Sequence, residues 1–221
     1  LGAVMAAGGY AEHVVCVTSS HFASAEKEFR FPLDYGNQRP LSASWTVTGS
    51  GAFALGLNQK CRAHITGMTP GRIVDYGLKD SMNMGACMAP AAADTIERHL
   101  EDFHVQPQEY DRIITGDLGS VGQTVLIDLL REKGIDIAGR HMDCGIEIFD
   151  ADVQDTHAGG SGCGCSAVTL AAYILPMLES GEWKKVLFLP TGALLSKTSF
   201  NEGKSVPGIA HAVVLESPVV K

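Results

Sequence analysis

The sequence predicts an α/β fold made of two pseudo-symmetric halves, each layered as helix, sheet and helix, with the first half incomplete in this chain. Strand-like and helix-like segments alternate along its 221 residues, which is typical of sheets that are covered on both faces. Hydrophobic residues make up 45% of the chain and charged residues 19%, a balance that supports a packed core. A helix, a glycine turn and a strand also recur in the same order, at residues 1–20 and 166–192.

The first part of the chain predicts a helix followed by three strands. Small residues at 1–7 favour a helix that ends at a pair of glycines, and HVVCVTSS (13–20) has the continuous apolar run of a buried strand. A loop rich in charged and aromatic residues follows, from His21 to about Pro40. SWTVTGSGAFALGL (44–57) predicts a second strand, whose glycines indicate a bulge or a close backbone neighbour, and CRAHITGM (61–68) predicts a third.

The middle of the chain predicts two helices and two strands. Met88–Phe103 is the clearest helix, with a proline near its start. YDRIITGD (110–117) predicts a strand, and Ser120–Gly134 predicts a helix with the serine as its N-cap and the glycine just beyond its last turn. In CGIEIFD (144–150) apolar and polar side chains alternate, which predicts a half-buried strand.

The last third predicts a glycine-rich turn at Gly159–Cys165 and then a helix to about residue 178. A buried strand follows at 184–192 (KKVLFLPTG). After a further loop, SVPGIAHAVVLES (205–217) predicts the final strand.

The two helix–strand units are copies of one pattern. Gly9 and Gly181 each end a helix and lead into a buried strand. A later strand ends alike in the two copies, as Gly51–Leu55 and His211–Leu215. This self-similarity predicts two halves of common architecture.

The repeat also sets the domain prediction. In the second half, residues 61–221, a glycine-rich turn and roughly a hundred residues of further elements precede the repeated helix. We expect the equivalent elements of the first half to lie upstream of the first residue. Residues 1–60 are therefore predicted to be the C-terminal part of the first half.

The composition argues against several classes of function. The formal net charge is −8 and no cluster of Lys and Arg stands out, so we expect no nucleic-acid partner. No apolar run reaches the ~18 residues that span a bilayer. The six cysteines form no CxxC pair, so we expect reduced thiols, no metal site and no cofactor.

Seven strings carry a resemblance to a known family. They are TSSH (18–21), FRFPLDYG (29–36), SWTVTGSGA (44–52), MNMGACMAPAAADTI (82–96), TGDLGSVG (115–122), DCGIEIFD (143–150) and AGGSGCGCSAV (158–168). Together they are similar to the stage V sporulation protein AD family of endospore-forming bacteria, which has a thiolase-like fold. The similarity covers nearly the whole chain, and the last three strings are specific to that family.

The resemblance implies a role in sporulation. Members bind dipicolinic acid (pyridine-2,6-dicarboxylate) and belong to the spore membrane complex that takes it into the forespore. The implied partners are dipicolinic acid and the other subunits of that transport complex. The implied location is peripheral, as a soluble protein associated with the spore inner membrane at the forespore and mother-cell interface. A homodimer is expected through the strand after His13, because an unpaired edge strand invites association.

The same resemblance argues against catalysis. Thiolase-fold condensing enzymes need a cysteine nucleophile at a helix N-terminus and further His or Asn groups. The repeat places that cysteine turn before Leu1. The His-x-x-Asn motif of ketoacyl-ACP synthase III corresponds here to Ile113–Leu118, which has no histidine, and the other Asn or His position falls near Cys163. We therefore assign no catalytic residue and expect a degenerate thiolase-fold protein that is not an enzyme. Two alternatives stay open, an active thiolase or ketoacyl-ACP synthase-type acyltransferase and a scaffold that needs no ligand.

The first candidate binding residues are those of the glycine-rich turn. Gly160, Ser161, Gly162 and Cys163 precede a helix, so their backbone N–H groups would suit a carboxylate such as dipicolinate. The alternative is structural, with Cys163 and Cys165 as small apolar groups packed at a tight turn.

Four further residues complete the candidate site. Thr115 and Asp117 end a strand that we expect to face the glycine-rich turn, although Asp117 is equally suited to cap the next helix. His21 ends a strand where loops gather, the alternative being a histidine that is hydrogen-bonded elsewhere. Asn83 lies on a glycine-flanked loop that is placed to reach the cleft.

Three other side chains are weaker candidates. Arg30 and Arg72 have the bidentate fork that matches a carboxylate, but such arginines are more often surface residues. Trp45 would suit stacking on a pyridine ring, whereas a buried strand tryptophan is the simpler interpretation.

Overall fold

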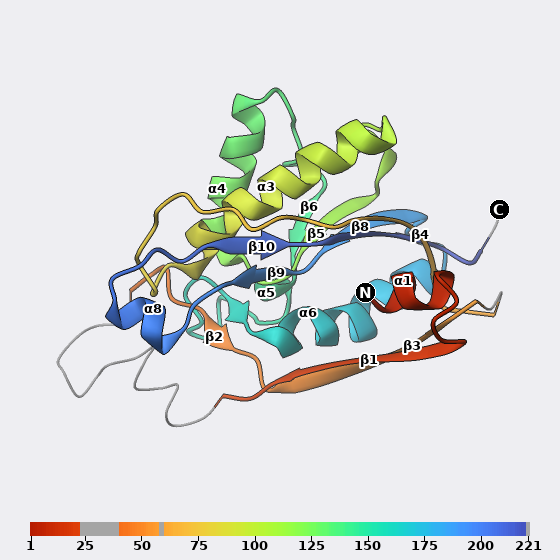
Figure 1. The fold of residues 1–221 in the computed structure, drawn as a ribbon, viewed down its shortest axis with the longest axis horizontal. Coiled ribbons are helices and arrows are strands. Elements are labelled where there is room, and N and C mark those ends of the chain that lie inside the picture. Colours follow the sequence, from red (N-terminus) through yellow and green to blue (C-terminus); the bar gives the residue numbers. More distant parts are fainter. Residues whose placement is uncertain (23–39, 58–59, 220–221) are drawn as a thin grey trace.

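A mixed sheet of five strands forms the centre of the described chain (Figure 1). The computed structural model describes residues 1–22, 40–57 and 60–219. From one edge to the other, the strands are β4 (His64–Thr69), β11 (Ala212–Glu216), β8 (Lys185–Leu189), β5 (Arg112–Thr115) and β6 (His141–Asp143). Strand β5 is parallel to β6 and β8, whereas β11 is antiparallel to β8 and β4. The predicted α/β class is confirmed.

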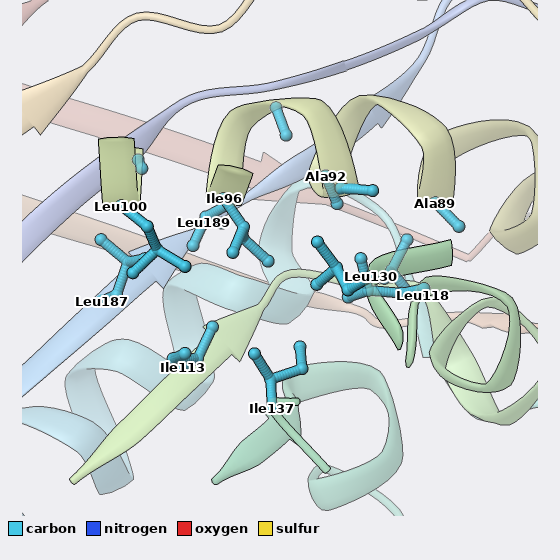
Figure 2. Close-up of a cluster of buried hydrophobic side chains, with 14 of the residues drawn as sticks. Ala89, Ala92, Ile96, Leu100, Ile113, Leu118, Leu130, Ile137, Leu187 and Leu189 are labelled. Atoms are coloured by element: carbon cyan, nitrogen blue, oxygen red, sulfur yellow. The ribbon is translucent and has the colours of Figure 1, made fainter. Parts of the chain in front are cut away.

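Two helices cover one face of this sheet, α3 (Met84–Phe103) and α4 (Gly119–Glu132) (Figure 1). Figure 2 shows side chains of α3 pointing toward Ile113 and Leu187 on the strands. Ala89 and Ala92 are fully buried, and their small side chains let the helix backbone lie close to its neighbours. The larger buried side chain of Ile96 fills the remaining space, and burying one such side chain contributes about 2 kcal/mol.

Helix α3 begins earlier than predicted. Its first residue is Met84, because the side chain of Asn83 accepts a hydrogen bond from the backbone N–H of Ala86 at 3.3 Å and caps the helix. Pro90 therefore lies inside the helix and not near its start.

The start of α4 also differs from the prediction. The helix begins at Gly119 with Leu118 in the N-cap position, and Ser120 is not the cap. Its end is as predicted, since Gly134 follows the C-cap residue with φ +79°.

Residues 144–150 do not form the predicted strand. Cys144–Glu147 form the single-turn helix α5, and the strand of this region is β6, just before it. Asp143 caps α5 by accepting a hydrogen bond from Gly145 N at 3.0 Å. One helical turn is too short to show a period of its own, so the alternation of side chains was misleading.

A second, antiparallel sheet lies on the other side of the molecule from α3 and α4 (Figure 1). It consists of β1 (His13–Ser20) and β3 (Gly49–Gly56). Between the two sheets lie α1 (Gly2–Ala7) and the helix that starts with α6 (Cys163–Thr169). The predicted strand 44–57 is divided, because its first part forms β2 (Trp45–Thr46), which pairs in parallel with β7 (Gly160–Ser161).

The internal repeat is confirmed by the strand register. Val14 faces Leu55 in the β1–β3 ladder, and Val186 faces Leu215 in the β8–β11 ladder. These are the positions that the sequence repeat matches. The same kind of helix-to-strand connection therefore leads into both sheets. The division of the chain at residue 60 stays a prediction.

The outer face of the β1–β3 sheet differs from its counterpart. Val15 and Val17 are each 67% exposed. The residues that the repeat matches to them, Leu187 and Leu189, are buried under α3 and α4. In the described chain, the first half thus lacks the outer helical layer that the second half has (Figure 1).

The helix after the glycine-rich turn contains a π turn. Helix α6 continues as the π segment η3 (Leu170–Ile174) and then as α7 (Leu175–Glu179). The wide turn directs Ile174 to the core and leaves Tyr173 43% exposed. Four of the buried positions, Cys165, Thr169, Ile174 and Leu178, are spaced by four, five and four residues.

Shorter elements complete the second half. Strand β9 (Thr191–Ala193) pairs with β10 (Gly208–Ala210), so the predicted strands 184–192 and 205–217 are each divided in two. The others are η2 (Pro107–Glu109) and α8 (Lys197–Asn201). Among the residues that the structure describes, no helix is both long and apolar enough to cross a membrane.

Candidate functional site

The loop after β5 is held by the carboxylate of Asp143 at the end of β6. Asp143 is 1% exposed, and its Oδ1 accepts hydrogen bonds from Thr115 Oγ1 at 2.6 Å and Leu118 N at 2.9 Å. Its Oδ2 accepts from Gly119 N at 2.9 Å and Gly145 N at 3.0 Å. The adjacent strands β5 and β6 are parallel and end at the same edge, which brings this carboxylate to the loop. Because both oxygens are fully engaged, the side chain has one fixed orientation.

Asp143 was not among the residues predicted for the site. Its sequence signal is that of an N-cap, an aspartate directly before a helical turn. The assignment of residues 144–150 to a strand concealed that signal.

Thr115 joins Asp143 to a histidine on the neighbouring strand. His141 Nε2 lies 3.0 Å from Thr115 Oγ1, and His141 Nδ1 lies 2.9 Å from Gln123 Nε2. Since Thr115 donates to Asp143, its oxygen accepts from His141 Nε2–H, and His141 Nδ1 then accepts from the Gln123 amide. Burial lowers the pKa of His141 to about 4, against the opposing effect of the Asp143 charge, so the ring is neutral at pH 7.

Asp117 lies on the same loop and contacts the glycine-rich turn. Its Oδ2 accepts a hydrogen bond from Gly162 N at 2.9 Å, and its Oδ1 accepts one from Thr191 Oγ1 at 2.9 Å. Asp117 therefore links the loop after β5 to the start of α6 and to β9. It does not cap α4, so that alternative is wrong.

The glycine-rich turn offers fewer free N–H groups than the sequence suggested. Gly162, with φ +96°, donates its N–H to Asp117. The N–H of Gly164 is bound by Ser20 Oγ at 2.8 Å, from the end of β1. Side chains far away in the sequence thus already bind two N–H groups of this turn, which leaves fewer of them for a ligand.

A cavity of about 530 Å³ lies beside this turn. Its wall is mostly apolar, with Phe53, Met88 and Phe188 among the larger side chains. Among the described lining residues, Asp117 is acidic and none is Lys, Arg or His. The polar side chains around it are Thr18, Ser44, Ser161, Cys163, Ser166 and Thr191.

Four predicted site residues meet at this cavity. Ser161, Gly162, Cys163 and Asp117 all line it, although they come from two separate segments. The predicted meeting of the strand end with the glycine-rich turn is therefore confirmed.

The other four predicted residues do not line the cavity. Thr115 is buried behind it against Asp143, and Asn83 caps α3. A Cβ on Gly160 would lie 2.7 Å from Ile148 Cγ2, so side-chain packing alone disfavours a larger residue at this position. His21 is exposed at the end of β1.

Of the three cysteines near the cavity, two are buried and one is exposed. Cys165 is fully buried, and burial together with the charge of Asp117 raises the pKa of its thiol. Burial likewise raises the pKa of the Cys144 thiol. Cys163 is exposed and lines the cavity. The packing alternative thus holds for Cys165 and fails for Cys163.

The weaker candidates lie elsewhere. Trp45 stacks on Phe22 with ring centroids 5.0 Å apart. Arg72 forms a surface ion pair with Asp94 at 2.6 Å. Arg30 lies outside the described residues. In the described part of the chain, no group of three or more His, Cys, Asp or Glu residues is arranged to hold a metal ion.

Comparisons with known proteins agree with the fold. The family profile described as stage V sporulation protein AD matches residues 1–216. The stage V sporulation protein AD of Bacillus subtilis (strain 168) is 44% identical over 209 residues, which are 95% of this chain and 61% of that protein. Among solved structures, 3-oxoacyl-[acyl-carrier-protein] synthase III from Aquifex aeolicus VF5 has a TM-score of 0.52 at 14% identity, over 97% of this chain and 61% of that one. The tetronic acid condensing enzyme AbyA1 has a TM-score of 0.53 at 13% identity, over 96% of this chain and 62% of that one. The predicted thiolase-like fold is confirmed.

Proposed function

Because the chain belongs to the stage V sporulation protein AD family, we propose that it is a non-catalytic sporulation protein whose cavity binds dipicolinate. The chain spans 61% of the length of its curated relative. The activity and partners of the whole protein are therefore part of the proposal.

The position of Asp117 is the observation that carries the non-catalytic assignment. Condensation of thioesters develops negative charge on oxygen, and active enzymes place hydrogen-bond donors at that point. Here a carboxylate takes up the N–H of Gly162 and the hydroxyl of Thr191 at the edge of the cavity. A fixed negative charge that consumes the local donors opposes such a transition state.

The cavity has the size and the surface for a small aromatic ligand. Its volume of about 530 Å³ lies within the usual range for small-molecule sites. Phe53, Met88 and Phe188 supply apolar surface for a pyridine ring. The two carboxylates of dipicolinate need hydrogen-bond donors or cations, and the described lining offers serine and threonine hydroxyl groups but no Lys, Arg or His. Asp117 then opposes the binding of the dianion.

Calorimetric titration with dipicolinate tests this proposal in the present chain and in the longer Bacillus subtilis relative. Asp117→Asn keeps the shape of the side chain and removes its charge. We expect it to tighten binding about tenfold, ~1.4 kcal/mol. Asp128→Asn is the matched control, because that carboxylate is exposed on α4 and should leave the affinity unchanged. Equal affinities for wild type and Asp117→Asn would place the site elsewhere, and acyl transfer from a thioester substrate would favour the enzyme alternative.

The proposal includes the assembly and location that the family implies. We propose a homodimer that associates peripherally with the spore inner membrane through the other subunits of the dipicolinate transport complex. Support for self-association comes from strand β1, which among the described residues pairs with β3 alone and so leaves one edge open. Val17→Lys should reduce the mass measured by light scattering, and a monomeric wild-type protein would contradict the dimer.

A further inference from the structure

The carboxylates of Asp143 and Asp117 connect the interior of the predicted second half with the cavity. Asp143 lies behind the cavity and does not line it, whereas Asp117 lines it. The residues between them along the contact path are Leu118 and Gly119, whose N–H groups Asp143 binds. The position of the Asp117 side chain therefore depends on a loop that Asp143 anchors.

The loop has little freedom to move without that anchor changing. A Cβ on Gly119, which has φ +65°, would lie 2.4 Å from Ala158 O. A Cβ on Gly116 would lie 2.8 Å from Thr191 N. The backbone on both sides of Asp117 thus runs in close contact with neighbouring segments. A shift of the Asp143 side chain would therefore also move Asp117, because the packed loop between them cannot deform.

The Asp143 carboxylate is itself oriented by a series of hydrogen-bonded side chains. Thr115 donates to Asp143 and accepts from His141, which accepts in turn from Gln123 on α4. The Thr115 hydroxyl lies 2.6 Å from Asp143 Oδ1 and 3.5 Å from Met142 O, so it donates mainly to the carboxylate and helps to set its direction. Such a supporting arrangement is what holds the residues of a binding site at fixed geometry.

We infer that Asp143 is a positioning residue for the cavity, which acts through the loop to Asp117 and so fixes Gly162 at the start of α6. The role of Asp143 in ligand binding rests on the proposed function, in which the cavity binds a ligand. Its effect on the geometry of the protein is independent of any ligand.

Amide hydrogen exchange in the ligand-free chain, resolved by residue, tests the inference. Asp143→Asn keeps the size of the side chain but replaces one acceptor oxygen with a donor that faces N–H groups. Exchange at Gly162 N–H, which Asp143 does not touch, should become at least tenfold faster. Thr115→Val removes one of the four donors to Asp143 and is the milder variant, should Asp143→Asn not fold. It should change exchange at Gly162 in the same direction.

Tyr110→Phe is the control for general loss of stability, since it removes a buried hydrogen bond to His99 away from the cavity. It should leave Gly162 exchange close to the wild-type rate. Faster exchange confined to Leu118, Gly119 and Gly145 would reduce Asp143 to a local cap and overturn the inference. An equal effect from Tyr110→Phe would overturn it as well.

A dipicolinate titration of the same variants separates the two proposals. If wild type binds and Asp143→Asn binds at least tenfold more weakly while Tyr110→Phe does not, the positioning role extends to the ligand. If wild type binds no dipicolinate, the proposed function fails, and the exchange experiment still decides the role of Asp143.

Discussion

Gly9 and Gly181 adopt the same left-handed backbone conformation, each with φ +74°. Gly9 N–H binds Ala6 O at 3.2 Å, and Gly181 N–H binds Leu178 O at 3.1 Å. Each glycine thus ends a helix of the central layer and turns the chain into a strand, one in each sheet. The two halves of the molecule therefore have the same glycine turn between helix and strand.

Replacement of either glycine by alanine should destabilise the protein by about 1 kcal/mol, because an L side chain disfavours this φ. Urea unfolding of Gly9→Ala and Gly181→Ala measures the effect. Gly139→Ala is the control, since Gly139 has an ordinary φ and no atom within 4 Å of its Cβ position. Similar losses in all three variants would show that the conformation at Gly9 and Gly181 is not the cause.

Gly164→Ala should have a larger effect, of roughly 3 kcal/mol. A Cβ at this position would lie 2.5 Å from Gly49 O and 2.6 Å from Ser20 Oγ, so α6 would have to move away from the β1–β3 sheet. The same movement would break the hydrogen bond from Gly164 N to Ser20. The free energy of unfolding measures the loss. A loss no greater than that of Gly181→Ala would mean that the sheet shifts easily.

Tyr110→Phe should lower the free energy of unfolding by about 1–3 kcal/mol. The phenol oxygen lies 2.6 Å from His99 Nε2, and both residues are buried, so the variant leaves a polar ring atom without its partner. Burial also raises the pKa of Tyr110 to about 12, which keeps the phenol protonated. Tyr76→Phe is the matched control because Tyr76 is 63% exposed. It should leave stability unchanged, and an equal loss there would contradict the burial argument.

Stability should fall as the pH is lowered from about 6.5 to about 4. Burial lowers the pKa of both His99 and His141 to about 4, with Lys185 adding to the effect at His99. The unfolded chain, with an ordinary pKa of about 6.5, therefore binds protons first as the pH falls, and this favours unfolding. Below about 4 both states are protonated and the effect of these two groups is complete.

Urea unfolding at several pH values measures this loss. We expect about 3 kcal/mol for each histidine. His99→Gln should remove its share of the pH dependence, whatever it does to stability at pH 7. The same slope in that variant and in wild type would exclude His99 as a source.

The sequence repeat predicted the architecture well because the repeat fixes long-range pairing. Once Gly9 is matched to Gly181, the partner of Val14 follows from that of Val186. The sequence also predicted that the end of β5 faces the glycine-rich turn, since strand ends and helix starts meet at the edge of a layered sheet, but it did not predict the contact of Asp117 with Gly162. These features depend on patterns that recur along the chain.

The partners that satisfy the site could not be predicted in the same way. Ser20 binds Gly164 N and Thr191 binds Asp117, contacts between residues far apart in the sequence that follow no local pattern. Asp143 was missed for a different reason. Its helical turn is so short that its capping signal was outweighed by the alternation of the residues after it.

The π turn at Leu170–Ile174 marks a point where the helix holds one residue more than a regular α-helix needs. Cys165 and Thr169 lie before it and Ile174 and Leu178 after it, all on the buried side. Loss of one residue within the turn would leave a continuous α-helix with both pairs still facing inward. A length difference between related chains is therefore better tolerated here than one turn to either side, where the same deletion would rotate half of the helix out of the core.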